Sequence, residues 1–119
     1  MAQPNIVGVT TIYGKTDVLS VTTVATAITS NSAASGEVYK INNVIVSNID
    51  GTNDATIDIY IFRAAVAYYV AKTITVPANA SLVALSKETA LYLEEGDDLY
   101  CLASADGDLQ AVCSYEIIS

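Results

Sequence analysis

Acidic side chains are concentrated in one short stretch, "ALYLEEGDDLYCLASADGD", which runs from residue 90 to residue 108. Six of the chain's 13 Asp and Glu residues lie there, in two clusters around Gly96 and Gly107: Glu94, Glu95, Asp97, Asp98, Asp106 and Asp108. Calcium takes about six to eight oxygen ligands, and carboxylates supply many of them. The candidate metal site is therefore a calcium site on Glu94, Glu95, Asp97 and Asp98.

Turn chemistry explains the same residues without a ligand, and the sequence favours this interpretation. The spacing does not match an EF-hand loop, and adjacent residues at a strand end point to opposite faces. Gly96 permits a positive φ, and "ADGDL" is typical of an Asp-Gly hairpin turn. Glu94 and Glu95 would also face apart, not across a cleft as glycoside hydrolysis requires. We expect no metal and no catalytic carboxylate pair.

The composition argues against several function classes. The chain has no histidine, which removes the Ser-His and Cys-His catalytic arrangements and the most common zinc ligand. Its net charge is −8 and its five Lys and Arg residues are scattered, so no cation cluster is available for nucleic acid, and anionic membranes would be repelled. We expect no enzymatic activity, no cofactor, no export signal, and neither nucleic acid nor membrane as a partner.

The pattern along the chain is that of strands separated by turns. Short runs rich in Val, Ile and Thr alternate with turn signals, and "TIDIYIF" (56–62) places Ile57, Ile59 and Ile61 on one face. The expected strands begin with 5–14 and 18–29, and a bulge is expected near Asn42-Asn43, where the apolar alternation changes phase. The predicted fold is all-β: a single-domain antiparallel β-sandwich, jelly-roll-like, of about eight strands over residues 5–119. Residues 1–4 are predicted to be a flexible N-terminal arm.

The two cysteines, Cys101 and Cys113, flank the Asp106 turn. If residues 106–108 form a hairpin loop, position 101 faces position 113, and both sulfurs lie on the apolar side. The favoured interpretation is two small buried thiols in the core. A cross-strand disulfide is the alternative, and it requires an oxidising compartment.

The eight tyrosines are candidate contact residues, because tyrosine is an amphipathic anchor in protein interfaces. Tyr68 and Tyr69 are adjacent, so in a strand they face opposite ways and one of them should be outside the core. A sugar-binding platform would more often use tryptophan, which is absent. The predicted role is a protein interface.

Two segments carry a resemblance to a known family: "VYKINNVIVSNIDGTNDATIDIYI" (38–61) and "AKTITVPANASLVALSKETALYLEEGDDLYCLASADGDLQAVCSYEIIS" (71–119). Their "SNIDGT", "VPA", "YLEEGD" and "ASA" turn and strand signatures resemble those of small structural proteins from tailed phages, especially marine cyanophages. The resemblance covers roughly residues 18–119. The chain keeps the Tyr115-Glu116 pair near its end but has Ile117 where a second acid is frequent.

The resemblance implies a virion component with no catalytic residues. The expected function is that of a non-enzymatic capsid decoration or cement subunit, a homo-oligomer that contacts the major capsid protein or other virion proteins on a symmetric lattice. Neck, tail or fibre components and a jelly-roll carbohydrate-binding module for host attachment are the alternatives. The N-terminal segment could add to a neighbour's sheet edge, so the candidate interface residues are Met1, Ala2, Gln3, Pro4, Asn5, Tyr68 and Tyr69.

If turn chemistry explains the acidic clusters, a chelator should leave the melting temperature unchanged within about a degree or two. A ligand at 100 times its dissociation constant stabilises a protein by about 2.7 kcal/mol, which moves the midpoint of a small domain by several degrees. Thermal unfolding with and without EDTA makes the comparison. A drop of several degrees in EDTA would favour the calcium site on Glu94 to Asp98.

Overall fold

The structure is a computed structural model that describes residue 8 and residues 11–119. Its elements are β1 (Ile12–Ser20), β2 (Thr26–Ser30), β3 (Val38–Asn48), β4 (Ala55–Arg63), β5 (Val66–Val76), β6 (Ser81–Leu85), the 3-10 turn η2 (Lys87–Thr89), β7 (Leu91–Leu93), β8 (Asp98–Ala103) and β9 (Leu109–Ile118). The expected arm at 1–4 lies outside the described residues. So do residues 5–7, 9 and 10 of the expected strand 5–14. No helix in the described ranges is both long enough and apolar enough to cross a membrane.

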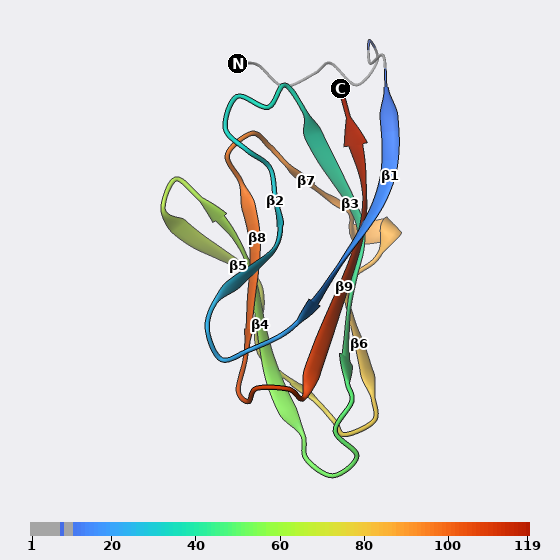
Figure 1. Cartoon of the computed structure of the whole chain (residues 1–119), viewed down its shortest axis with the longest axis vertical. Helices are drawn as coiled ribbons and strands as arrows, with labels where there is room; N and C mark the ends of the chain where they lie inside the picture. Colours follow the sequence, from blue (N-terminus) through green and yellow to red (C-terminus); the bar gives the residue numbers. More distant parts are fainter. Residues whose placement is uncertain (1–7, 9–10) are drawn as a thin grey trace.

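The strands form two antiparallel sheets that pack face to face (Figure 1). The strand order is β1-β9-β3-β6 in one sheet, here called sheet A, with β7 also paired to β3, and β2-β8-β4-β5 in the other, sheet B. The pairs are nested along the chain: β1 with β9, β2 with β8, β3 with β6 and β7, and β4 with β5. This nesting is a long antiparallel hairpin wrapped into two sheets, which is the jelly-roll arrangement. The predicted β-sandwich is confirmed, and because β6 and β7 share one place beside β3, the prediction of about eight strands holds.

The core lies between the sheets and follows the two-residue period of each strand. Ile57 and Ile59 of β4 are fully buried, as are Leu99 and Cys101 of β8. On β3 the buried positions change from Ile41 to Val44, and the pairing of β3 with β9 shifts between Ile41 and Asn43. The bulge predicted near Asn42-Asn43 is therefore present, and it returns the apolar residues of both halves of β3 to the core.

The predicted boundary between the first two strands is wrong. The run 18–29 was expected to be one strand, but β1 extends to Ser20 and β2 begins at Thr26. In the intervening segment the Val21 N–H donates to the Leu109 carbonyl (2.9 Å), and the Thr22 hydroxyl lies 3.2 Å from the Val24 N–H. Valine and threonine favour strands wherever they occur, so the composition did not reveal where the chain crosses from sheet A to sheet B.

The predicted hairpin at residues 106–108 is also wrong. β8 belongs to sheet B and β9 to sheet A, so the Asp106 turn crosses between the sheets. Asp106 accepts a hydrogen bond from the Thr23 N–H (2.8 Å), and Gly107 has a φ of +81°. Asp-Gly chemistry suits any tight turn that needs a positive φ, whichever strands it joins.

Both cysteines face the core, but from opposite sheets. Cys101 pairs with Ile59 and Thr26, whereas Cys113 pairs with Val44 and Asp17. The prediction of buried thiols is confirmed, because neither side chain is exposed and both are free cysteines. The prediction that they are neighbours in adjacent strands is wrong.

We expect both thiols to resist alkylation in the native protein and to react after denaturation. Burial raises the pKa of Cys101 to about 12 and that of Cys113 to about 11, so the reactive thiolate is scarce at neutral pH. Thiol titration with and without guanidinium measures this. Rapid reaction of either cysteine in the folded state would contradict the placement of these strands.

Candidate interface at the β4–β5 hairpin

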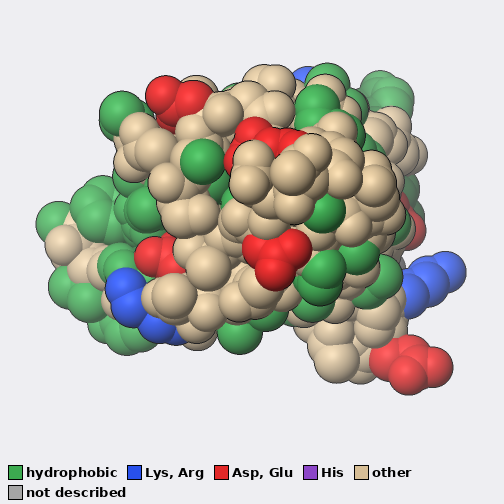
Figure 2. Space-filling view, turned by 90° about the horizontal axis from the view of Figure 1, so that it is seen from below, with side chains coloured by type: hydrophobic (Ala, Val, Ile, Leu, Met, Phe, Trp, Pro, Cys, Tyr) green, Lys and Arg blue, Asp and Glu red, His purple; other side chains and the backbone are tan. Residues whose placement is uncertain are grey.

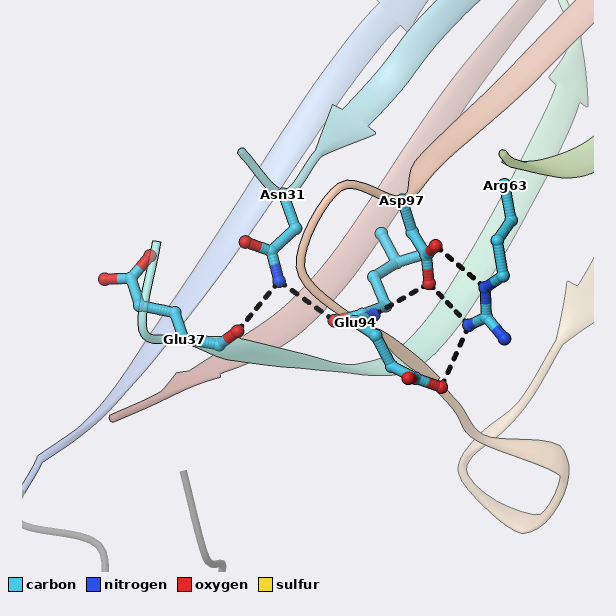
Figure 3. A network of polar contacts seen from close by, with 6 residues as sticks. Asn31, Glu37, Arg63, Glu94 and Asp97 are labelled. Atoms are coloured by element: carbon cyan, nitrogen blue, oxygen red, sulfur yellow. Dashed lines mark hydrogen bonds and ion pairs between the residues drawn. The ribbon is translucent and has the colours of Figure 1, made fainter. Parts of the chain in front are cut away.

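The acidic turn between β7 and β8 is built around the carboxylate of Asp97. This side chain is only 2% exposed. It accepts hydrogen bonds from the Glu94 N–H (2.8 Å) and from Nε (2.8 Å) and Nη2 of Arg63. The same Nη2 lies 3.0 Å from Oε2 of Glu94, so the guanidinium bridges two carboxylates (Figure 3). A buried carboxylate with this set of donors is well compensated for its loss of water.

Asn31 holds the other side of the same turn. Its backbone N–H donates to the Asp97 carbonyl (2.9 Å), and its own carbonyl accepts from the Gly96 N–H (2.8 Å). Its buried side-chain amide donates to the carbonyls of Glu37 and Leu93, each at 3.0 Å (Figure 3). The β7–β8 turn is thus fixed between the β2–β3 loop and the end of β4.

The four residues of the calcium alternative are not brought together around an empty centre. Glu94 and Asp97 bind Arg63, Glu95 accepts from the Gly36 N–H (2.9 Å), and Asp98 is the first residue of β8. Over the ranges that the structure describes, no group of three or more acidic, histidine or cysteine side chains is arranged to hold a metal ion. The acidic cluster around Gly96 instead anchors the turn end of the neighbouring β4–β5 hairpin through Arg63.

That hairpin joins β4 to β5 through a two-residue turn. Arg63 pairs with Val66, and the turn residues Ala64 and Ala65 have φ values of 52° and 62°. A turn with two positive φ values is the tight hairpin form that glycine and asparagine normally occupy, so an Ala-Ala pair gives no turn signal in the sequence. The anchoring role of Arg63 was not predicted either, because its carboxylate partners lie some thirty residues further along the chain.

The hairpin extends beyond the rest of the sandwich (Figure 1), and the first half of β5 exposes large hydrophobic side chains. Val66, Tyr68 and Tyr69 are 47%, 57% and 48% exposed. Figure 2 shows hydrophobic side chains gathered on the lobe at the left, where the hairpin lies in Figure 1. Only one of Tyr68 and Tyr69 was expected to be outside; both are exposed because β5 is an edge strand whose first half projects from the sandwich. The other candidates, Met1, Ala2, Gln3, Pro4 and Asn5, lie outside the described residues.

A cluster of aromatic side chains from β4 and β8 packs against Tyr69. The Tyr60 ring lies 5.1 Å from the Tyr69 ring and 5.6 Å from the Tyr100 ring, and Phe62 stacks on Tyr100 at 5.4 Å. Lys72 adds a cation–π contact, with its Nζ 4.5 Å from the centre of the Tyr69 ring. Such contacts restrict the rings before any partner arrives, which lowers the entropy cost of binding.

The other side of the hairpin has a hollow of about 350 Å³ lined by Ile61, Arg63 and Tyr68. Its lining combines an apolar wall, a cation that is already ion-paired and a phenol. These groups include no nucleophile paired with a base, so the arrangement suits contact with another surface better than a reaction.

Comparison with known proteins supports the fold assignment. No protein-family model matches the chain, and no curated protein matches it. Among solved structures, the chain is similar to a subunit of Bacillus endospore appendages, described as a novel family of disulfide-linked pili, with a TM-score of 0.54 and 17% identity over 100% of this chain and 96% of that chain. At this identity the likeness shows a shared β-sandwich fold.

We expect Arg63→Met to reduce the free energy of unfolding by about 2–3 kcal/mol, because it leaves the Asp97 carboxylate buried without its cation. The expected loss of stability is smaller than for a fully buried ion pair because the Arg63 side chain is itself 45% exposed. The matched control is Glu94→Gln, which removes the more exposed ion pair of Arg63 and should cost about 0.5 kcal/mol. Urea unfolding measures both, and equal small losses would contradict the role assigned to Asp97.

Proposed function

We propose that this chain is a non-enzymatic structural subunit that works by assembling with other subunits. The observation that carries the proposal is the β4–β5 hairpin, which is anchored by Arg63 next to its turn and presents Val66, Tyr68 and Tyr69 to solvent. Exposed apolar side chains that are gathered on a rigid element are typical of interaction surfaces.

The size of this surface points to assembly through many copies. The three side chains expose roughly 200 Å² of apolar area, which corresponds to about 5 kcal/mol at roughly 25 cal/mol per Å². Association costs about 4–15 kcal/mol in lost translational and rotational freedom. One hairpin contact is therefore weak on its own, whereas repeated contacts on a lattice add up.

Other features of the chain support a structural role. The described acidic residues near the hairpin serve turns and ion pairs, and the sequence contains no histidine to act as a general base. The net charge of −8 favours solubility at high concentration before assembly.

Within this class, we propose that the chain decorates the capsid of a tailed phage, located on the virion and bound to the major capsid protein or another virion protein. The support is the resemblance of residues 18–119 to small phage structural proteins. The jelly-roll fold, which recurs among capsid domains, agrees with it at the level of fold analogy. A neck, tail or fibre component is the alternative on the same resemblance.

A fibrous cell appendage is the second candidate, and the similarity to an endospore appendage subunit favours it. That subunit belongs to disulfide-linked pili. Here both cysteines of the sequence are buried in the core, so contacts between copies of the folded chain would be non-covalent.

The test is binding of the purified protein to capsids that lack the decoration subunit, together with electron microscopy of the protein alone. We expect saturable binding, and Tyr68→Ser/Tyr69→Ser should weaken it at least tenfold, about 1.4 kcal/mol. Tyr92→Ser is the matched control, because Tyr92 is similarly exposed (42%) but lies on β7 in sheet A, whereas the hairpin belongs to sheet B.

Three outcomes would contradict either the proposal that the chain assembles through the hairpin or the narrower proposal that it decorates a phage capsid. Filaments formed by the protein alone would favour the appendage role over capsid decoration. Specific glycan binding without any assembly would favour the carbohydrate-binding module. Equal binding by the double variant and the wild type would show that the hairpin is not the contact surface.

A further inference from the structure

A row of apolar side chains crosses the outer face of sheet A. Val18 of β1 pairs with Val112 of β9, Val112 with Ile45 of β3, and Ile45 with Val83 of β6. These four residues, here called the valine row, share one face because they are direct cross-strand partners. The two ends of the row are open to solvent, with Val18 74% and Val83 58% exposed.

The rows on either side of the valine row carry no charge. One flanking row consists of Ser20, Gln110, Ser47 and Ser81. The flanking row on the opposite side consists of Thr16, Ser114 and Asn43. Several of these hydroxyls bond to one another across strands: Ser47 to Ser81 at 2.9 Å and Thr16 to Ser114 at 3.1 Å. Groups that already satisfy each other lose little when a partner displaces water. This face also has a hollow of about 300 Å³ between β1 and β9, which is lined in part by Val18, Ser20, Gln110 and Val112.

Charge identifies the partner that this face suits. Each copy of the chain carries a net charge of −8, so surfaces rich in carboxylates repel each other when two copies meet. Figure 2 shows Asp and Glu side chains in several patches over the end of the molecule that carries the β3–β4 and β8–β9 loops. The valine row and its flanking rows place no carboxylate at the contact, which lets one acidic copy approach another.

We propose that two copies of this chain pack through the outer faces of their A sheets, with the valine rows at the centre of the contact. The proposal rests on the proposed function, namely that the chain assembles, and it names one of the contacts. Face-to-face sheets lie about 10 Å apart and interdigitate their side chains, and β-branched residues suit such a surface. The contact is self-complementary, so a two-fold axis relates the copies.

The dimensions predict a weak dimer. With strands about 4.8 Å apart and residues about 3.4 Å apart along them, four strands and three rows cover roughly 400 Å². A standard stable interface covers about 800 Å² on each partner. We therefore expect dissociation in dilute solution and association at high concentration or on a lattice, where other contacts contribute.

The experiment is sedimentation of the full chain over concentrations up to about millimolar. Wild-type protein should show a monomer–dimer equilibrium, and Val18→Glu and Val83→Glu should each weaken it at least tenfold, because each places like charges at the contact of both copies. The matched control is Val24→Glu: Val24 is 70% exposed and lies in the β1–β2 connection, off this face, so its association should match the wild type. Circular dichroism and melting temperature verify folding, which these exposed positions should not disturb.

A wild-type monomer at every concentration would overturn the proposal, and so would dimers that both glutamate variants form as well as the wild type does. The second result would leave the proposed function standing if Tyr68→Ser/Tyr69→Ser still weakens capsid binding at least tenfold. Loss of capsid binding in the face variants without any change in self-association would assign the face to a different protein and would equally overturn the two-copy contact.

Discussion

The buried carboxylate of Asp97 links the end of β4 to the turn between β7 and β8. The carboxylate accepts hydrogen bonds from the Arg63 guanidinium at the end of β4 and from the Glu94 N–H in its own turn. The backbone carbonyl of Asp97 accepts a hydrogen bond from the Asn31 N–H. Removing one partner of such a pair leaves a charge with too little compensation. This carboxylate therefore ties the turn end of the β4–β5 hairpin to the β7–β8 turn, one residue beyond the last β4–β8 pair, Phe62 with Asp98.

Much of the architecture could be predicted because the two-residue alternation is a direct consequence of burying one face of each strand. The alternating isoleucines of β4 indicated its core face, and the change of phase at Asn42-Asn43 indicated the bulge. The pairing of strands was harder, since local chemistry does not encode the partner. The Asp-Gly turn at Asp106 suits a hairpin and a crossing between sheets equally well, which is why Cys101 and Cys113 were placed in adjacent strands and are in fact in different sheets.

The site was predicted only in part for the same reason. Tyr68 and Tyr69 could be identified as contact residues from their type and adjacency, but not the projection that exposes both. The acidic residues around Gly96 were correctly assigned to a turn, yet their anchoring function depends on Arg63, which is distant in sequence. An Ala-Ala turn with positive φ values has no local signature at all, and it forms here where the strands on either side of it are paired.

We infer that this jelly roll acts through exposed surfaces that meet other subunits. A cryo-electron microscopy map of the particle or fibre that contains this chain tests this inference most directly. We expect the tip of the β4–β5 hairpin to be buried against a neighbouring subunit, with the side chains of Tyr68 and Tyr69 at the contact. A map in which the hairpin projects into solvent, and neighbouring subunits meet elsewhere, would contradict it.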